Sequence, residues 1–247
     1  MKLTLVIPMY NEQNNLKSTL PVITAYMRAI FREDYEILFV DDGSTDGSAD
    51  AVEKYADAAT RVLRNAKNRG KGYAVRQGML AARGEIVIFT DCDLAYGTDA
   101  IGALYTLLSE NAAADAALAS RDLHPDGYAG YSFFRRFVSR TYRAVLRVFF
   151  GLRLSDSQSG LKGFRRAAAR AIFSRAEVDR YAFDFEAIMI GTRIGVRFAE
   201  MPARVIQNSE GRIRFFRDSL RMLRDLVRIR RRVRQIPPHS FRAADEK

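Results

Sequence analysis

The amino-acid sequence predicts an α/β protein with a mixed, mainly parallel sheet and helices on both faces. Three observations indicate this class. Short runs of apolar residues recur through the first 120 residues, longer stretches with helical spacing separate them, and polar clusters follow four of the runs. Strands that are apolar on both sides are typical of parallel sheets covered by helices. The 247 residues suffice for one large domain with a buried core.

Five apolar runs are the expected strands, and the stretches between them have the spacing of helices. Leu16, Leu20, Ile23 and Met27 recur every three or four residues, which places them on one face of a helix. Such alternation is the pattern of consecutive β–α–β units. The strands are expected at KLTLVI (2–7), YEILFV (35–40), RVL (61–63), EIVIFT (85–90) and DAALAS (115–120).

After residue 125 the pattern changes. Residues 131–152 predict an amphipathic helix, and residues 156–166 predict a polar, glycine-punctuated loop that leads into a helix. A further helix is expected at 182–195 and a late strand at 196–206. The second half is therefore expected to add helices to the sheet of the first half.

A last helix is expected from about 214 to 235, because apolar residues recur there and the prolines Pro237 and Pro238 then end it. The predicted division of the chain is a domain over 1–211 that includes the 131–153 helix, a basic amphipathic helix over 212–236, and a flexible tail over 237–247.

Positive charge is concentrated in two segments of a chain whose net charge is +11. Residues 212–236 carry a net charge of +8 and residues 131–153 one of +6, so the remainder has a net charge of −3. Basic residues beside an apolar stripe are typical of helices that lie in a membrane interface. Because each basic residue near an anionic leaflet contributes about 1 kcal/mol, we expect peripheral binding to an anionic membrane surface.

Composition excludes several other classes. No recognised nucleic-acid motif occurs, so no nucleic-acid partner is expected. One cysteine and two histidines argue against disulfides and a zinc site, and no apolar run reaches 18 residues. The apolar part of the N-terminus is too short for a signal peptide. We expect a cytoplasmic protein at the inner face of the membrane, and a homo-oligomer is compatible with the sequence.

Polar clusters follow four of the expected strands: PMYNE (8–12), DDGSTDGS (41–48), DCD (91–93) and SRD (120–122). Ligands of open α/β sheets collect at the carboxyl ends of the strands, so the four clusters are expected to converge. Asp91 and Asp93 are either solvated turn residues or ligands of Mg²⁺ or Mn²⁺, which bind carboxylates and substrate phosphates. Asp41 has no evident structural role and is expected to accept a hydrogen bond from a planar base.

These motifs together resemble the family 2 glycosyltransferases of the GT-A type. The resemblance rests on LVIPMYNE, VDDGSTDGS, NRGKGYAVRQG (68–78) and TDCDLAYG, and it extends over residues 2–232. DSQSGLKGFRR is similar to the DTQCGFK region of dolichyl-phosphate mannose and glucose synthases, and FDFE (183–186) is similar to their FDVE. The stretch SEGRIRF with DLVRIRRR resembles the end of the dolichyl-phosphate glucosyltransferase branch.

The resemblance implies a role for particular residues. Asp156 is either a base or the anchor of its loop. Ala95 stands where mannose synthases tend to carry a glutamine, so either a water or another side chain fills that metal position or the metal binds more weakly. The implied groups are the nucleotide-sugar site Pro8, Tyr10, Glu12, Asp41, Asp42, Lys71 and Asp91, the metal ligands Asp91 and Asp93, the acceptor-phosphate site Arg135, Ser139, Arg212 and Arg214, and the catalytic residues Asp93, Arg121 and Asp156.

The function that the resemblance implies is transfer of a hexose, with inversion, from a nucleotide sugar to a polyprenyl phosphate at the membrane surface. UDP-glucose and GDP-mannose both remain open as donors. Two alternatives also remain open: a family 2 glycosyltransferase acting on a polysaccharide or glycolipid, and a basic nucleotide-binding or nucleic-acid-binding α/β protein without catalysis. Fixed positive charge and a divalent ion would stabilise a leaving nucleoside diphosphate.

Overall fold

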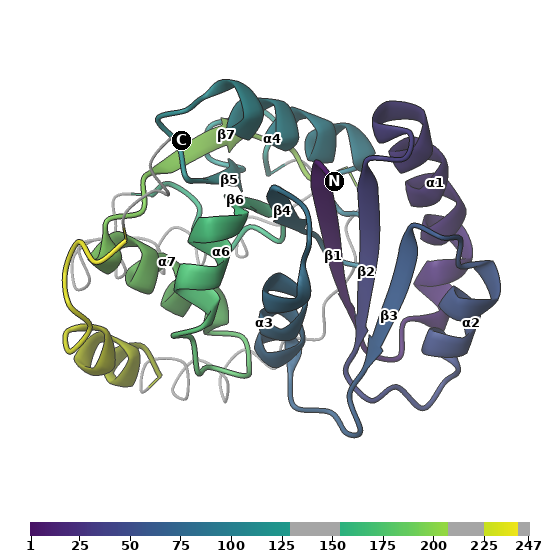
Figure 1. Cartoon of the computed structure of the whole chain (residues 1–247), viewed down its shortest axis with the longest axis horizontal. Helices are drawn as coiled ribbons and strands as arrows, with labels where there is room; N and C mark the ends of the chain where they lie inside the picture. The colour runs from purple at the N-terminus through teal and green to yellow at the C-terminus, as the bar shows by residue number, and fades with distance from the viewer. Residues whose placement is uncertain (129–153, 207–224, 242–247) are drawn as a thin grey trace.

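A computed structural model describes residues 1–128, 154–206 and 225–241 of the chain (Figure 1). Several predictions lie outside these residues: the amphipathic helix at 131–153, the first part of the basic helix at 212–224, and the tail from 242 onward. The four residues expected at the acceptor phosphate also lie outside: Arg135, Ser139, Arg212 and Arg214.

Within the described residues, seven strands form one sheet in the order β3-β2-β1-β4-β6-β5-β7. Neighbouring strands are parallel except that β6 runs antiparallel to both β4 and β5. The predicted mixed, mainly parallel sheet is therefore confirmed. The strands are β1 (Leu3–Met9), β2 (Tyr35–Asp41), β3 (Thr60–Arg64), β4 (Ile86–Phe89), β5 (Ala116–Ser120), β6 (Lys162–Arg165) and β7 (Phe198–Pro202).

Helices cover both faces of the sheet, as predicted (Figure 1). Alternate residues of β1 show this directly, because Val6 packs into the core on one face while Leu5 and Ile7 pack into the core on the other. The first face is covered by α3 (Lys71–Ala81), α6 (Arg166–Phe173) and α7 (Phe183–Ile194), and the second by α1 (Gln13–Phe31), α2 (Ser48–Tyr55) and α4 (Thr98–Glu110).

The central strand β6 was not predicted, because residues 156–166 were expected to form a loop before a helix. Lys162–Arg165 instead forms hydrogen bonds to β4 on one side and β5 on the other. The strand has four residues, and two of them are charged, so no apolar run marks it. Gly163 fits there because a Cβ would meet Leu108 of α4 at 2.9 Å. Its position in the sheet depends on neighbours that are distant in the sequence.

The structure describes only residues 225–233 of the C-terminal helix, so the interfacial helix expected over 212–236 stays a prediction. Its apolar stripe, Leu226, Ile229 and Val233, is buried in the same core cluster as α6 and α7. A helix docked on a protein core and a helix lying in a membrane interface have the same amphipathic pattern, so the sequence does not distinguish them. The stripe therefore stabilises the fold and is not available to lipid.

The start of the predicted flexible tail is also attached to the protein. The His239 N–H donates to the Arg193 carbonyl at 3.0 Å, and the Phe241 N–H donates to the Ile194 carbonyl at 2.9 Å. Both bonds hold the chain to the end of α7. None of the helices in the described part of the chain is both long and apolar enough to cross a membrane.

Candidate active site

A cavity of about 620 Å³ lies at the carboxyl ends of β1, β2 and β4. It includes residues from three of the four predicted polar clusters. A second cleft, of about 940 Å³, lies between α1 and α4 and contains none of the predicted site residues. The smaller cavity is therefore the candidate active site. Its lining residues are Pro8, Met9, Tyr10, Glu12, Asn15, Asp42, Asn68, Gly70, Lys71, Ala74, Asp91, Cys92, Asp93, Arg180 and Tyr181.

The turn after β1 forms one edge of the cavity. Asn11 has a left-handed backbone (φ 54°), which asparagine tolerates better than most residues, and its side chain accepts the Thr45 N–H at 2.8 Å. The Glu12 N–H donates to the Ser48 hydroxyl at 2.9 Å. These bonds tie the turns after β1 and β2 together and leave Tyr10, with 46% of its surface exposed, at the mouth.

Glu12 lies close to the two acids that follow β4. Burial raises the pKa of the Glu12 carboxyl, and the Asp93 and Asp91 carboxylates raise it further, although the Asn15 amide, which donates at 2.5 Å, opposes the shift. Acidic groups that repel one another are stabilised by a cation placed among them. The cavity therefore has the electrostatic character of a cation site.

Asp91 and Asp93 stand on a tight turn at the end of β4. Leu94 adopts φ 50° in this turn, a conformation that is costly for a residue with a branched side chain. The Ala95 N–H donates to Asp93 Oδ1 at 3.1 Å, and the Lys71 ammonium lies 2.5 Å from Asp91 Oδ1. The Ala95 N–H and the Lys71 ammonium thus hold the two carboxylates at the edge of the cavity.

The donor set fits a divalent ion that is completed by a substrate. No group of three His, Cys, Asp or Glu side chains within the described ranges is arranged to hold a metal without help. Mg²⁺ is commonly bound through one or two carboxylates together with substrate phosphates, which is what Asp91 and Asp93 offer. The geometry therefore favours an ion held jointly by the protein and a diphosphate.

The loop at 156–160 closes against Asp91 from the other side. Gly160 has no side chain, and a Cβ there would lie less than 3.0 Å from the Asp91 carboxylate. Two residues further on, the Lys162 ammonium is buried, where it contacts the Ser159 carbonyl and lies 2.7 Å from the Asp184 carboxylate. The loop and Asp91 are consequently in direct contact.

Lys71, Asp184 and Lys162 form a cluster of charges beside Asp91, in which Lys162 is buried and the other two are partly exposed. Burial opposes the charge on Lys71, but the Asp91 and Asp184 carboxylates outweigh it, so the pKa of Lys71 lies above its usual value. Burial raises the pKa of Asp184, with the two lysines opposing that shift. Sequence analysis did not assign roles to Lys162 and Asp184, although GLKG and FDFE contain them.

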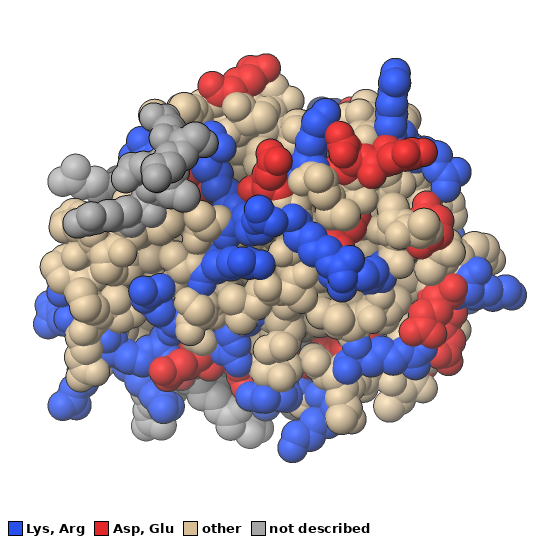
Figure 2. All heavy atoms as spheres, viewed as in Figure 1, with Lys and Arg blue, Asp and Glu red and all other residues tan. Residues whose placement is uncertain are grey.

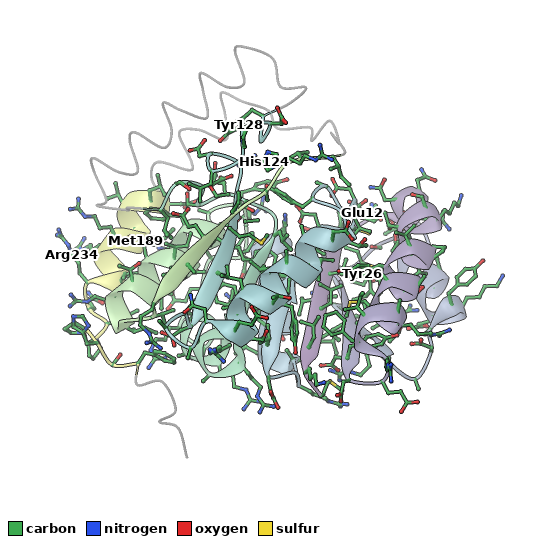
Figure 3. All side chains as sticks on the ribbon, turned by 90° about the horizontal axis from the view of Figure 1, so that it is seen from above. Glu12, Tyr26, His124, Tyr128, Met189 and Arg234 are labelled. Atoms are coloured by element: carbon green, nitrogen blue, oxygen red, sulfur yellow. The ribbon has the colours of Figure 1, made fainter. Side chains whose placement is uncertain are left out.

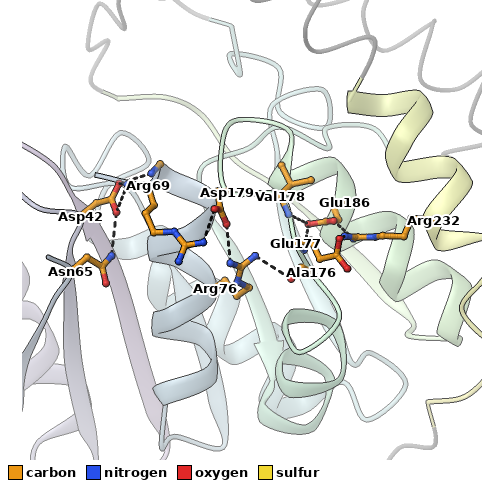
Figure 4. Close-up of polar contacts among 11 residues, drawn as sticks. Asp42, Asn65, Arg69, Arg76, Ala176, Glu177, Val178, Asp179, Glu186 and Arg232 are labelled. Atoms are coloured by element: carbon orange, nitrogen blue, oxygen red, sulfur yellow. Dashed lines mark hydrogen bonds and ion pairs between the residues drawn. The ribbon is translucent and has the colours of Figure 1, made fainter. Parts of the chain in front are cut away.

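Asp41 has a structural role that the sequence did not show, while its expected hydrogen bond from a planar base stays a prediction. Its side chain is 4% exposed, it accepts the Ser44 N–H at 3.0 Å, and it is not among the described residues that line the cavity. Asp42 does line the cavity and also organises it (Figure 4). Its carboxylate accepts the Gly70 N–H at 2.6 Å, which fixes the N-terminus of α3 and hence Lys71.

Arg121 and Asp156 form a buried ion pair outside the cavity. Arg121 donates through Nε at 2.6 Å and through Nη2 at 2.8 Å to the two Asp156 oxygens. Burial by itself would raise the pKa of Asp156, but the Arg121 guanidinium holds the pKa below its usual value. Two roles were left open for Asp156, a base and a loop anchor. This arrangement favours the anchor, because a carboxylate that accepts two hydrogen bonds from a guanidinium is a weak base.

The segment after β5 reaches the same side of the molecule as the cavity. Figure 3 places Glu12 on the same side as His124 and Tyr128, which follow Arg121 in the chain. Among the four predicted clusters, this one supplies no residue to the described lining of the cavity. The acceptor residues expected from sequence, which begin at Arg135, would continue from here but lie outside the described residues.

One segment that lines the cavity had no predicted site residue. Arg180 and Tyr181 reach the cavity from the segment between α6 and α7, and 66% of the Tyr181 surface is exposed. The available signal was an arginine–aromatic pair directly before FDFE, at the start of a predicted helix. Phe183, only two residues later, is buried in the core.

Comparison with known proteins identifies the family. The sequence model of Glycosyl transferase family 2 matches residues 4–173. A dolichyl-phosphate beta-glucosyltransferase of Drosophila melanogaster is 31% identical over 242 residues, covering 93% of this chain and 74% of that protein. The protein of the same name from Homo sapiens is 30% identical over 244 residues, covering 94% and 75%.

A solved structure shows the same fold at lower identity. The glucosyl-3-phosphoglycerate synthase of Mycobacterium tuberculosis, in complex with Mg²⁺ and UDP, has a TM-score of 0.66 and 20% identity, covering 96% of this chain and 80% of that chain. The sequence match extends over most of the chain and includes the residues that line the strand-end cavity in the first half. The chain belongs to glycosyl transferase family 2.

Proposed function

We propose that this glycosyltransferase moves glucose from a nucleotide sugar of the UDP-glucose type to a polyprenyl phosphate at a membrane surface, with inversion. The observation that supports it most is the strand-end cavity, where Glu12, Asp91 and Asp93 meet the Lys71 ammonium. Both relatives described above are called dolichyl-phosphate beta-glucosyltransferases, which favours glucose over mannose and a lipid phosphate over a polysaccharide.

Asp91 and Asp93 are the residues that would hold Mg²⁺ or Mn²⁺ in this proposal. A divalent ion supplies positive charge that stabilises a departing nucleoside diphosphate. The Mycobacterium tuberculosis structure contains Mg²⁺ and UDP, which supports such an ion in this fold. Lys71 adds fixed charge beside Asp91, and Asp42 keeps Lys71 in position through the N-terminus of α3.

The proposed acceptor does not require a general base from the protein. A phosphate monoester with a second pKa of about 6 is largely dianionic at neutral pH, so it is already a nucleophile that requires orientation more than deprotonation. Asp156, held by Arg121, is suited to shaping its loop and not to accepting a proton. Arg135, Ser139, Arg212 and Arg214 remain the residues proposed to orient the acceptor phosphate.

Membrane attachment is proposed to be electrostatic. Leu226, Ile229 and Val233 of the C-terminal helix are buried, whereas Arg228 and Arg231 of the helix and Arg234 of the turn after it are exposed. Figure 2 shows Lys and Arg side chains gathered over this part of the molecule, at the lower left of the view. Basic side chains facing an anionic leaflet favour binding without any insertion of the helix.

A labelled-lipid assay tests the proposed function. Purified protein is incubated with Mn²⁺, polyprenyl phosphate and either UDP-[¹⁴C]glucose or GDP-[¹⁴C]mannose, and the lipid fraction is treated with mild acid. We expect label from UDP-glucose in an acid-labile lipid, and none with Asp93→Ala, because loss of a metal ligand removes charge stabilisation. Asp126→Ala, which alters an exposed acid after β5, is the matched control.

Three outcomes would contradict parts of this proposal. Label from GDP-mannose alone would replace the donor, and label in an added neutral glycolipid or polysaccharide alone would replace the acceptor. Full activity of Asp93→Ala would remove the proposed metal ligand.

A further inference from the structure

The loop between α6 and α7, residues 176–181, brings a second cation to the donor cavity. Within the described lining of the cavity, the cationic side chains are Lys71 and Arg180, set against four acids. Lys71 is paired with Asp91, whereas Arg180 pairs with no carboxylate of the described residues. The Arg180 guanidinium is thus a positive group at the cavity that is available to an anionic ligand.

The N-terminus of α3 holds this loop at very short range. The Tyr73 N–H donates to the Asp179 carbonyl at 3.1 Å. A Cβ at Gly70 would lie less than 3.0 Å from the Asp179 carbonyl, and one at Gly72 would lie less than 3.0 Å from the Val178 carbonyl. The two glycines of the RGKG stretch therefore permit the loop to pack directly on the α3 backbone.

Charged side chains reinforce the contact with α3. The Asp179 carboxylate lies 3.0 Å from Arg69 Nη2 and 2.8 Å from Arg76 Nη2 (Figure 4). Arg69 also provides one of the backbone N–H groups that Asp42 accepts, at 3.1 Å. The same short stretch of chain thus connects the loop to the acid that organises the cavity.

The other end of the loop is held by α7 and the C-terminal helix. Glu186 of α7 is fully buried, and its carboxylate accepts the N–H groups of Glu177 at 3.0 Å and Val178 at 2.8 Å. Arg232 pairs with the same carboxylate and lies 2.5 Å from Glu177 (Figure 4). Burial raises the pKa of Glu186, and the Val178 N–H and Arg232 oppose that shift.

From these contacts we propose that Arg180 binds the diphosphate of the nucleotide-sugar donor, and that Arg232 is a positioning residue that keeps the Arg180 loop in place. An arginine presents paired N–H groups that match phosphate oxygens, which suits this site better than a lysine would. The inference rests on the proposed function, because it assumes a diphosphate donor in this cavity. If the inference is correct, the C-terminal helix is a structural part of the donor site, because its Arg232 holds the loop that carries Arg180.

Equilibrium binding tests the role of Arg180. UDP is titrated by calorimetry, with Mn²⁺ present, into the full-length protein and into Arg180→Ala, Arg180→Lys and Arg175→Ala. We expect the Kd for UDP to rise about tenfold or more in Arg180→Ala, since hydrogen bonds to charged groups are strong, and to recover partly in Arg180→Lys. Arg175 is exposed and lies outside the described lining of the cavity, so its variant should bind normally.

The outcomes of this titration separate the inference from the function on which it rests. An unchanged Kd for UDP in Arg180→Ala, with tight binding by the unmodified protein, overturns the inference alone. A raised KM for polyprenyl phosphate with an unchanged Kd for UDP assigns Arg180 to the acceptor phosphate and also overturns it. No binding of UDP, UDP-glucose or GDP-mannose by the unmodified protein would overturn the proposed function itself.

A double-mutant cycle tests the positioning role of Arg232. Arg232→Ala, Arg180→Ala and the double variant are compared with Arg231→Ala, which alters the adjacent exposed arginine of the same helix. If Arg232 acts through the loop, Arg232→Ala weakens UDP binding about fivefold in the normal background and by less than about twofold when Arg180 is absent, because coupled residues are not additive. Equal losses in both backgrounds, or an equal loss in Arg231→Ala, would contradict a role through Arg180.

Discussion

At the residue scale, the acids of the site differ in what each is paired with. Asp156 is bound by a guanidinium, Asp42 by backbone amides and Asp91 by an ammonium, while Glu12 is bound by an amide side chain beside other acids. These partners set the chemistry available to each group. A carboxylate whose pKa is lowered stays charged and stabilises the fold through its partner. Acids grouped around a cavity favour the binding of a cation there.

The substitution Asp156→Asn distinguishes the two roles proposed for Asp156, a loop anchor and a general base. Losing one charge of a buried pair should destabilise the protein by about 3 kcal/mol at pH 7, measured by urea unfolding. Because the folded-state pKa is lowered, this contribution is present above the unfolded value of 3.8 and is lost as pH falls through the folded value, so the two proteins converge in acid.

Turnover by the folded Asp156→Asn protein gives the mechanistic answer. An anchor predicts that kcat per folded molecule falls by less than about tenfold, whereas loss of a general base costs about 10²–10⁴-fold. Asn111→Ala, which changes a polar residue at the end of α4, serves as a control for general effects of substitution. A loss above about 100-fold with unchanged stability would assign Asp156 to proton transfer.

At the element scale, the sequence was sufficient to predict those strands and helices that have a run or a periodic pattern of apolar residues. The strands of the first half and the helix α7 were predicted because each has its own periodicity. The strand β6 was not, since its place depends on β4 and β5. Likewise the loop at 176–181 carries no periodic pattern, and its role depends on partners such as Arg69, Glu186 and Arg232, which folding alone brings together.

Gly160→Ala tests the contact between the 156–160 loop and Asp91. Because a Cβ would lie less than 3.0 Å from the Asp91 carboxylate, the acid or the loop must move. We expect Mn²⁺-dependent affinity for UDP, measured by calorimetry, to fall about tenfold, as it does when metal ligands are displaced through their neighbours. Gly102→Ala, where a Cβ would approach the Tyr26 hydroxyl away from the cavity, should leave UDP affinity unchanged. Equal losses in the two variants would indicate a general effect of strain.

Leu226→Ala and Val227→Ala distinguish a core helix from an interfacial one. Leu226 is 0% exposed and Val227 is 65% exposed. We expect Leu226→Ala to lower the free energy of unfolding by about 2–5 kcal/mol, and Val227→Ala to change it by less than about 0.5 kcal/mol. Loss of liposome binding in Leu226→Ala without loss of stability would restore the membrane-inserted helix.

At the scale of the whole molecule, the sheet joins the strands whose ends form the cavity to the strands that precede the C-terminal helix. The cavity is built by the ends of β1, β2 and β4, and its far wall comes from the loop before α7. That loop is tied to the C-terminal helix, whose outer face is basic. The proposed membrane surface and the proposed donor site are therefore connected through described contacts, which the distribution of charge along the sequence does not reveal.

Neutralising the outer face of the helix tests membrane attachment while the fold is kept. The triple variant Arg228→Gln, Arg231→Gln, Arg234→Gln should bind anionic liposomes about 3 kcal/mol more weakly at low salt, since each basic residue contributes about 1 kcal/mol. Sedimentation with anionic and with neutral vesicles gives the measurement. Affinity for UDP should be unchanged, because none of the three lines the cavity. If the triple variant and the unmodified protein sediment equally with anionic vesicles, these three arginines do not form the membrane contact.

We propose that the strand-end cavity binds a nucleoside diphosphate through an ion held by Asp91 and Asp93. A crystal structure of the protein grown with Mn²⁺ and UDP tests it most directly, because manganese is located by its anomalous signal. We expect one ion in contact with both acids and the diphosphate, and the Arg180 guanidinium on a phosphate oxygen. An empty cavity with UDP bound elsewhere, for example in the cleft between α1 and α4, would contradict it.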